Sequence, residues 1–174
     1  MNFLETYLKS VRAEFLRHKS LGEKTFDQLS EEEIHWKYSD SDNSVAIIVK
    51  HIVGNMLSRW TNFLTEDGEK TWRNRDTEFE RPYASKSEML EAWEKGWDCL
   101  FTALDSIDNT NVDSKVKIRN EDHSVIEAIN RQLAHYPSHI GQILFLGKMI
   151  KQQDWISLSI PKGQSEAFNK KMFG

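Results

Sequence analysis

The 174-residue sequence contains little glycine, proline or cysteine. Glycine and proline together number 11, roughly half of their usual share in globular proteins. This scarcity of turn-forming residues argues against a sandwich or barrel of many short strands and favours long helices. The single cysteine, Cys99, excludes an intrachain disulfide and a cysteine-based zinc ribbon. Its position beside an apolar helical stripe indicates a buried, inert thiol.

The sequence also lacks an excess of positive charge and any long hydrophobic run. Lysine and arginine number 23 against 27 aspartate and glutamate, a net charge of −4. Proteins that bind nucleic acids normally carry a basic excess, so that class is disfavoured. No apolar run approaches the roughly 18 residues of a membrane span, and the charged segment 1–20 has no signal-peptide core. We therefore expect a cytoplasmic protein with a single domain over residues 1–174 and no nucleic-acid or membrane partner.

Apolar residues recur at helical spacing in four long segments. Their lengths predict an all-α fold, a four-helix bundle with long connections between the helices. From the pattern alone, an antiparallel and a mixed arrangement of the helices are both possible. The expected helices span about 2–18, 44–67, 86–108 and 124–151.

Smaller signals refine this outline. S-x-x-E capping boxes at Ser85 and Ser124 begin the third and fourth helices, and another at Ser30 predicts a short helix after the first. Residues 115–120 alternate charged and apolar side chains, which is typical of either a short strand or an extended loop. The connection between the second and third helices is long enough to cross the whole bundle.

Two histidines in the fourth helix carry the clearest chemical signal. His135 and His139 are four residues apart, so their rings project from one helical face, one turn apart. This spacing allows two imidazoles to bind one metal ion, with a third ligand from a facing helix, for which His51 is the candidate. Pro137 lies between the pair and costs the helix about 3 kcal/mol, which also favours a functional site over an ordinary helix.

The surroundings of these histidines leave two interpretations open. Neither His51 nor the histidine pair lies at the centre of an apolar face, so they line either a polar pocket at the bundle edge or solvated helix surfaces. Arg59 and Asn55 share a flank of the second helix with His51 and could face the same pocket. Gln132, Gln142 and Asn55 are candidate partners for the second ring nitrogens of the histidines.

Three stretches of the sequence, residues 50–70, 127–143 and 157–165, resemble one subgroup of the DinB-like (YfiT-like) superfamily, a subgroup without an assigned function. The resemblance covers nearly the whole chain. It implies a bacterial four-helix bundle with up-down-down-up topology, often dimeric, that binds a divalent metal. The family's ligands are one histidine on the second helix and an H-x-x-x-H pair on the fourth, which correspond here to His51, His135 and His139.

The same resemblance implies an activity. Characterised relatives include thiol S-transferases that use bacillithiol or mycothiol, and a mycothiol-dependent isomerase. We expect a divalent metal, zinc or nickel before other ions, a low-molecular-weight thiol as cosubstrate and a small electrophile as substrate. No aspartate or glutamate lies within one turn of His135 or His139 to act as a general base, which favours thiol transfer over hydrolysis. A metal-dependent hydrolase and a non-catalytic, stress-associated metal-binding bundle are the alternatives, and no catalytic residue is assigned.

Two expectations concern surfaces. The second expected helix is apolar over much of its circumference and the chain has six tryptophans, which together predict a homodimer. The tail, residues 153–174, lacks helical periodicity and could fold over the site, bringing Lys162 or Gln164 near it.

Overall fold

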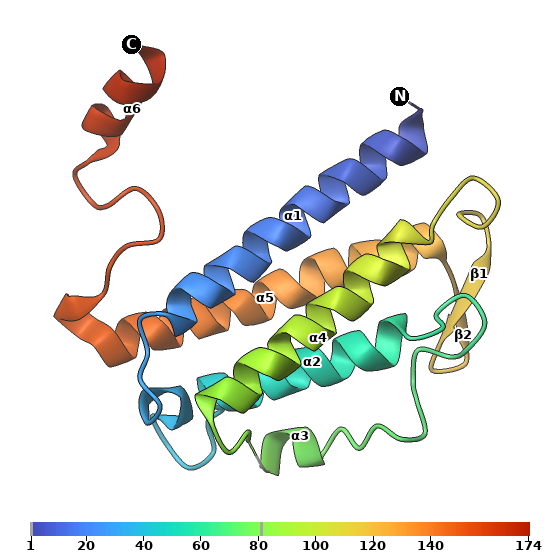
Figure 1. The fold of residues 1–174 in the computed structure, drawn as a ribbon, viewed down its shortest axis with the longest axis horizontal. Coiled ribbons are helices and arrows are strands. Elements are labelled where there is room, and N and C mark those ends of the chain that lie inside the picture. The colour runs from blue at the N-terminus through green and yellow to red at the C-terminus, as the bar shows by residue number, and fades with distance from the viewer. Residues whose placement is uncertain (1, 81) are drawn as a thin grey trace.

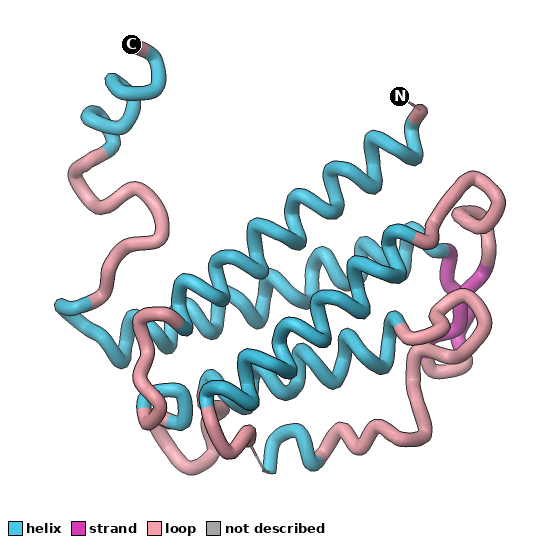
Figure 2. Tube along the Cα trace, in the orientation of Figure 1, coloured by secondary structure: helices cyan, strands magenta, loops and turns pink. Residues whose placement is uncertain are grey.

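The computed structural model describes residues 2–80 and 82–174, and it is mostly helical, as the sequence predicts (Figures 1 and 2). Within these ranges a small antiparallel hairpin accompanies six α-helices and two short 3-10 turns. The helices are α1 (Phe3–Phe26), α2 (Val45–Trp60), α3 (Thr77–Glu80), α4 (Lys86–Asp105), α5 (Val125–Lys151) and α6 (Ser165–Phe173). The turns are η1 (Glu33–His35) and η2 (Gln152–Asp154), and the strands are β1 (Lys115–Ile118) and β2 (Glu121–Ser124).

The four long helices lie side by side in two closely packed pairs. The most extensive contacts join α2 to α4 and α1 to α5, and α2 also contacts α5 and the short helix α3. In Figure 1, α2 and α4 run in one direction, and α1 and α5 run in the opposite direction. Helix α3 belongs to the connection between α2 and α4, and it covers the side of α2 that the other long helices leave open.

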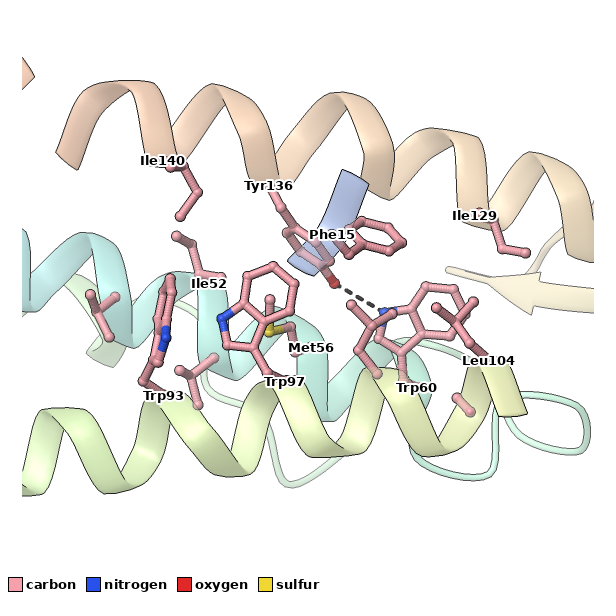
Figure 3. Packing of buried hydrophobic residues seen from close by; sticks show 14 of the residues in the cluster. Phe15, Ile52, Met56, Trp60, Trp93, Trp97, Leu104, Ile129, Tyr136 and Ile140 are labelled. Atoms are coloured by element: carbon pink, nitrogen blue, oxygen red, sulfur yellow. Dashed lines mark hydrogen bonds between the residues drawn. The ribbon is translucent and has the colours of Figure 1, made fainter. Parts of the chain in front are cut away.

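Large aromatic side chains fill the space between the helices (Figure 3). Trp93 and Trp97 of α4 and Phe15 of α1 have no exposed surface, and Trp97 packs edge-on against Tyr136 of α5. The indole Nε1 of Trp60 donates to the Tyr136 hydroxyl at 3.1 Å, which satisfies one buried polar group with another. These contacts fix α5 relative to α2 one residue away from His135.

Helix α4 ends at Asp105, three residues before the expected end, and two other helices end further from the expected positions. Helix α1 does not end near residue 18 but continues to Phe26, because Gly22 lies directly against Trp93 and the last turn is buried. Helix α2 ends at Trp60 rather than at the Asp67-Gly68 turn. The reason is that Thr61 is extended and Asn62 has a positive φ of 48°, a conformation that asparagine tolerates better than most residues.

The capping boxes precede helices of different lengths. At Ser124, the side chain accepts from the Glu127 amide and the Glu127 carboxylate accepts from the Ser124 amide, which forms the complete box. The Ser85 hydroxyl accepts from the Glu88 amide in the same way, at 3.1 Å. The box at Ser30 is also formed, but only the 3-10 turn η1 follows it.

The alternating segment 115–120 forms a strand and the turn that follows it. Strand β1 pairs with β2 in antiparallel register, and the two-residue turn between them consists of Arg119 and Asn120, both with positive φ. The Asp67 carboxylate accepts the backbone N–H groups of both turn residues, at 2.9 and 2.6 Å. A side chain from the α2–α4 connection therefore holds a turn that otherwise favours glycine.

The tail contradicts the expectation that it lacks helix. Residues 165–173 form α6, which buries none of its residues and stands apart from the bundle in Figure 1. Residues 155–159 of the tail lie against α1 and the end of α5, where Trp155 contacts Gly147.

Helix α2 is apolar around its circumference for a reason other than dimer contact. Thirteen of its 16 residues are buried within the chain, because α4, α5, α3 and η1 surround it. The argument for a homodimer from this helix is therefore wrong, although the oligomeric state itself stays a prediction. No helix in the described ranges is long and apolar enough to cross a membrane.

Candidate metal centre

The structure brings the three predicted histidines together. His51 extends from α2, and His135 and His139 extend from consecutive turns of α5. One ring nitrogen from each residue lies within 4.8 Å of the other two, and the Nε2 atoms of His135 and His139 are 3.0 Å apart. His51 is buried and the other two are half-buried, so the histidines lie in a polar pocket at the bundle edge rather than on a solvated surface.

The second nitrogen of each ring faces an oxygen acceptor. His135 Nδ1 lies 3.3 Å from Gln132 Oε1, and His139 Nδ1 lies 2.9 Å from Gln142 Oε1. His51 Nδ1 lies 2.9 Å from Glu78 Oε2. An acceptor at Nδ1 favours the tautomer that carries its proton there and leaves the Nε2 lone pair free for a metal ion.

Glu78 is the residue that sequence reasoning missed. Its carboxylate contacts His51 through Oε2 and binds the guanidinium of Arg73 through both oxygens, at 2.8 and 3.1 Å. Burial alone would raise the pKa of the Glu78 carboxyl, but the hydrogen bonds from His51 and Arg73 outweigh burial and hold that pKa below its usual value. Glu78 is therefore an anion that orients the His51 ring.

Asn55, the third candidate partner for the histidine rings, has a different role. The Oδ1 atom of Asn55 accepts from the buried hydroxyl of Tyr136 at 3.1 Å. Asn55 thus extends the hydrogen-bonded chain that begins at Trp60, and it fixes one wall of the pocket instead of a histidine ring.

The paired histidines are held in the neutral form that binds metals. Burial lowers the pKa of His135 to about 4, and the nearby positive charges add to this effect. Burial also lowers the pKa of His139, against a smaller opposing effect of the hydrogen bond to Gln142. Both imidazoles are consequently uncharged near pH 7, as metal ligands must be.

The donor set fits a divalent transition-metal ion. Nitrogen ligands about 2.0–2.1 Å from a tetrahedral zinc ion lie roughly 3.3 Å from one another, close to the separation of the two Nε2 atoms here. Neutral imidazoles suit zinc, nickel, copper, iron and cobalt, whereas magnesium and calcium prefer oxygen ligands. The residues that would hold the ion are His51, His135 and His139.

A pocket of about 460 Å³ adjoins the histidines. His51 and His135 line it together with the predicted residues Asn55, Arg59 and Gln132. Gln142, which contacts the His139 ring, does not line this pocket but a separate one.

A pocket of similar size, about 490 Å³, lies between α1, α5 and the tail and contains no histidine. Trp155 and the residues that follow it line that second pocket, and no residue of the tail lines the one beside the metal centre. The expectation that Lys162 or Gln164 approaches the histidines is therefore wrong. The cause is the course of the chain after α5, which leads it against α1.

The missing side chain of Gly54 leaves room for the Glu78 carboxylate. This contact leads to a testable prediction. A Cβ atom at position 54 would lie 2.9 Å from Cδ of Glu78 and closer still to its Oε1. In Gly54→Ala, we expect the carboxylate to move away from His51, and metal affinity to fall by about 10–100-fold, as for other lost partners of metal ligands. The helix should remain intact, because alanine is the better helix former and the displaced group is the flexible end of a side chain.

Gly141→Ala is the matched control for this prediction. Gly141 also lies inside a long helix, two residues after His139, but nothing lies within 4 Å of a Cβ atom there. Calorimetric titration with zinc should give wild-type affinity for Gly141→Ala. Equal affinity in Gly54→Ala would show that Glu78 does not support the metal centre.

Comparison with known proteins agrees with this architecture. Residues 2–164 match the model of a family described as protein of unknown function (DUF1572), a family with a DinB-like fold, and the match ends one residue before α6. No curated protein matches the chain. Since the family match covers nearly all of the sequence, the chain belongs to the DUF1572 family.

Proposed function

We propose that this protein is a divalent-metal-dependent enzyme that joins a small thiol to an electrophile. The observation that carries the proposal is the convergence of His51, His135 and His139, each with its Nδ1 atom on an oxygen acceptor. The directions of the four long helices support an up-down-down-up bundle, the topology of DinB-like proteins, in which we place this site.

A divalent ion held by three neutral imidazoles keeps its full charge and an open position, where it would lower the pKa of a bound thiol. The chain supplies the geometry around that position. Glu78, Gln132 and Gln142 orient the three rings, and the adjoining pocket has room for a small substrate. In the transfer, the thiol loses its proton to solvent, sulfur bonds to the electrophilic carbon, and the leaving group departs with its electron pair.

The contacts of Glu78 with His51 and Arg73 favour thiol transfer over hydrolysis. Hydrolysis at a metal centre usually uses a carboxylate or histidine near the attacking water as general base. Glu78 is the carboxylate in contact with the histidines, and both of its oxygens are bound to Arg73 or His51. No aspartate or glutamate lines the adjoining pocket within the described residues. A thiolate needs no such base during its attack.

The test of this proposal is a thiol-transfer assay on zinc- and nickel-loaded protein. Cysteine, glutathione and bacillithiol would be offered separately with 1-chloro-2,4-dinitrobenzene, in which the sulfur displaces chloride and the absorbance of the product is followed. We expect turnover with at least one thiol, and loss of that turnover after chelation and in His139→Ala.

His18→Ala is the control, because His18 lies on α1, where it contacts Glu14, and it takes no part in the cluster. Hydrolysis of an ester substrate without added thiol would instead support a metal-dependent hydrolase. Metal binding without turnover on any thiol or ester would contradict both enzymes and support a non-catalytic bundle. The proposed homodimer is tested separately, by sedimentation against the 20.4 kDa mass of one chain.

A further inference from the structure

We propose that the pocket beside the three histidines binds an oxyanion, a carboxylate or phosphate group of the substrate or of the thiol. The inference builds on the proposed function, since it names the chemical class that this function would use. It rests on a different set of residues, the arginines of the pocket, and can therefore be tested without metal.

Arginine side chains are concentrated in this pocket. Five of the chain's eight arginines line the pocket, although the protein as a whole carries a net charge of −4. They come from segments far apart in the sequence: α2, the connection to α3, the hairpin turn and α5. The fold brings them together against their mutual repulsion, as an anion-binding site requires. They are Arg59, Arg73, Arg75, Arg119 and Arg131.

Arg59 is the most informative of the five. Only 5% of its surface is exposed, and its Nε and Nη1 atoms are buried without a hydrogen-bond partner in the described structure. A buried guanidinium without partners is costly, and burial lowers the pKa of Arg59 accordingly. Gly68 preserves the space around it, because a Cβ atom there would lie 2.5 Å from Nη1. The site therefore contains buried, unpaired N–H donors of Arg59 that an oxyanion would satisfy.

The neighbouring acids do not neutralise the pocket. Arg73 is paired with Glu78, and Arg119 with Glu69 at 3.1 Å. Arg131, which is exposed on α5, forms no hydrogen bond or ion pair with any residue the structure describes. The Asp67 carboxylate also lies near Arg59. Three carboxylates thus face five guanidiniums, and the remaining positive charge is available to a ligand.

The turn that carries Arg119 is held in place by a side chain from outside the hairpin. Arg119 has a φ of 55°, an unfavourable backbone conformation for a residue with a side chain, and the Asp67 carboxylate holds it there. A two-residue hairpin turn requires this conformation, and the contacts with Asp67 keep Arg119 in a fixed place beside the pocket. Arg119 is itself part of the pocket lining.

The shape of the pocket indicates how a ligand would lie in it. His51 and His135 line the same space as the arginines, so a molecule whose acidic group binds Arg59 and Arg131 would extend toward the histidines. Guanidinium groups bind carboxylate and phosphate through paired, charge-assisted hydrogen bonds. A volume of about 460 Å³ is that of a small-molecule site.

The test is calorimetric titration of chelator-treated, metal-free protein at low ionic strength, with inorganic phosphate and with succinate as separate probes. We expect wild-type protein to bind at least one probe, and the stronger one identifies the group as phosphate or carboxylate. Binding should weaken by about tenfold or more in Arg59→Met and in Arg131→Gln, each of which removes charge-assisted hydrogen bonds. Arg131 is exposed, so its variant remains informative if Arg59→Met fails to fold.

Two controls separate this inference from the metal proposal. Arg12→Gln removes a partly exposed arginine that pairs with Asp105 outside the pocket, and it should bind the probes as wild type does. His135→Ala should lose metal and keep the anion. Absence of binding by either probe, or equal affinity in wild type, Arg59→Met and Arg131→Gln, would overturn the inference whatever the metal content proves to be.

Discussion

Replacing His135 by alanine will lower the metal content of the protein from about one divalent ion per chain to almost none. The reason is geometric, because the ring of His135 lies close to the rings of both other ligands. Its ring centroid is 4.7 Å from that of His139 and 5.6 Å from that of His51. Without it, two nitrogens remain, too few for a stable site with an open position. Elemental analysis of untagged protein after dialysis measures the change.

The variant should fold normally, since His135 is half-buried and its hydrogen bonds join it to Gln132 and His139 of the same helix. Circular dichroism and the melting temperature would verify this. His18→Ala, the matched histidine variant, should retain the full metal content. Equal metal in wild type and His135→Ala, with both well folded, would show that the three histidines do not form the binding site.

Replacing Arg59 by methionine will make the ligand-free protein more stable. A buried cation without partners is destabilising, and a long apolar side chain of similar length can occupy its space without that cost. We expect a gain of about 1–3 kcal/mol in the free energy of unfolding, several degrees in melting temperature for a chain of this size. Thermal unfolding in a buffer free of phosphate and carboxylates measures it.

Arg17→Met is the control for Arg59→Met, because Arg17 is exposed and pairs only with groups on its own helix. Its effect should stay within about 0.5 kcal/mol. Added phosphate should then stabilise the wild type more than Arg59→Met. A marked loss of stability in Arg59→Met would mean that the guanidinium makes a structural contribution in the folded chain, and the costly burial would need another explanation.

Local periodicity predicted the parts of the site that lie on one helix. The spacing of His135 and His139 placed their rings together, and Gln132 and Gln142, each three residues from one of them, indeed face their Nδ1 atoms. These relations depend only on helix geometry. His51 was a candidate third ligand because it lies on another long helix. The resemblance to a family assigned it that role, because no local pattern states which helix faces α5.

Glu78 and the arginine pocket could not be predicted in the same way. Glu78 lies on a four-residue helix inside a long connection, 27 positions from His51, and tertiary contacts alone set its place. One signal was present in the sequence: Gly54, a poor helix former inside a strongly apolar helix, indicates close approach of another group. The helix ends differed for a related reason, because Asn62 stops α2 although Phe63 and Leu64 continue its apolar pattern.

The Arg73–Glu78–His51 contact would couple the binding of the two proposed ligands, the metal ion and the anion. An anion that draws Arg73 away from Glu78 would strengthen the interaction of the Glu78 carboxylate with His51. A metal ion bound to His51 would in turn change how strongly Glu78 binds Arg73. By thermodynamic linkage, the factor by which the anion changes the metal affinity equals the factor by which the metal changes the anion affinity. Choice of buffer is then part of any measurement on this protein, since zinc affinities determined in phosphate and in an anion-poor buffer would describe two different states of one coupled site.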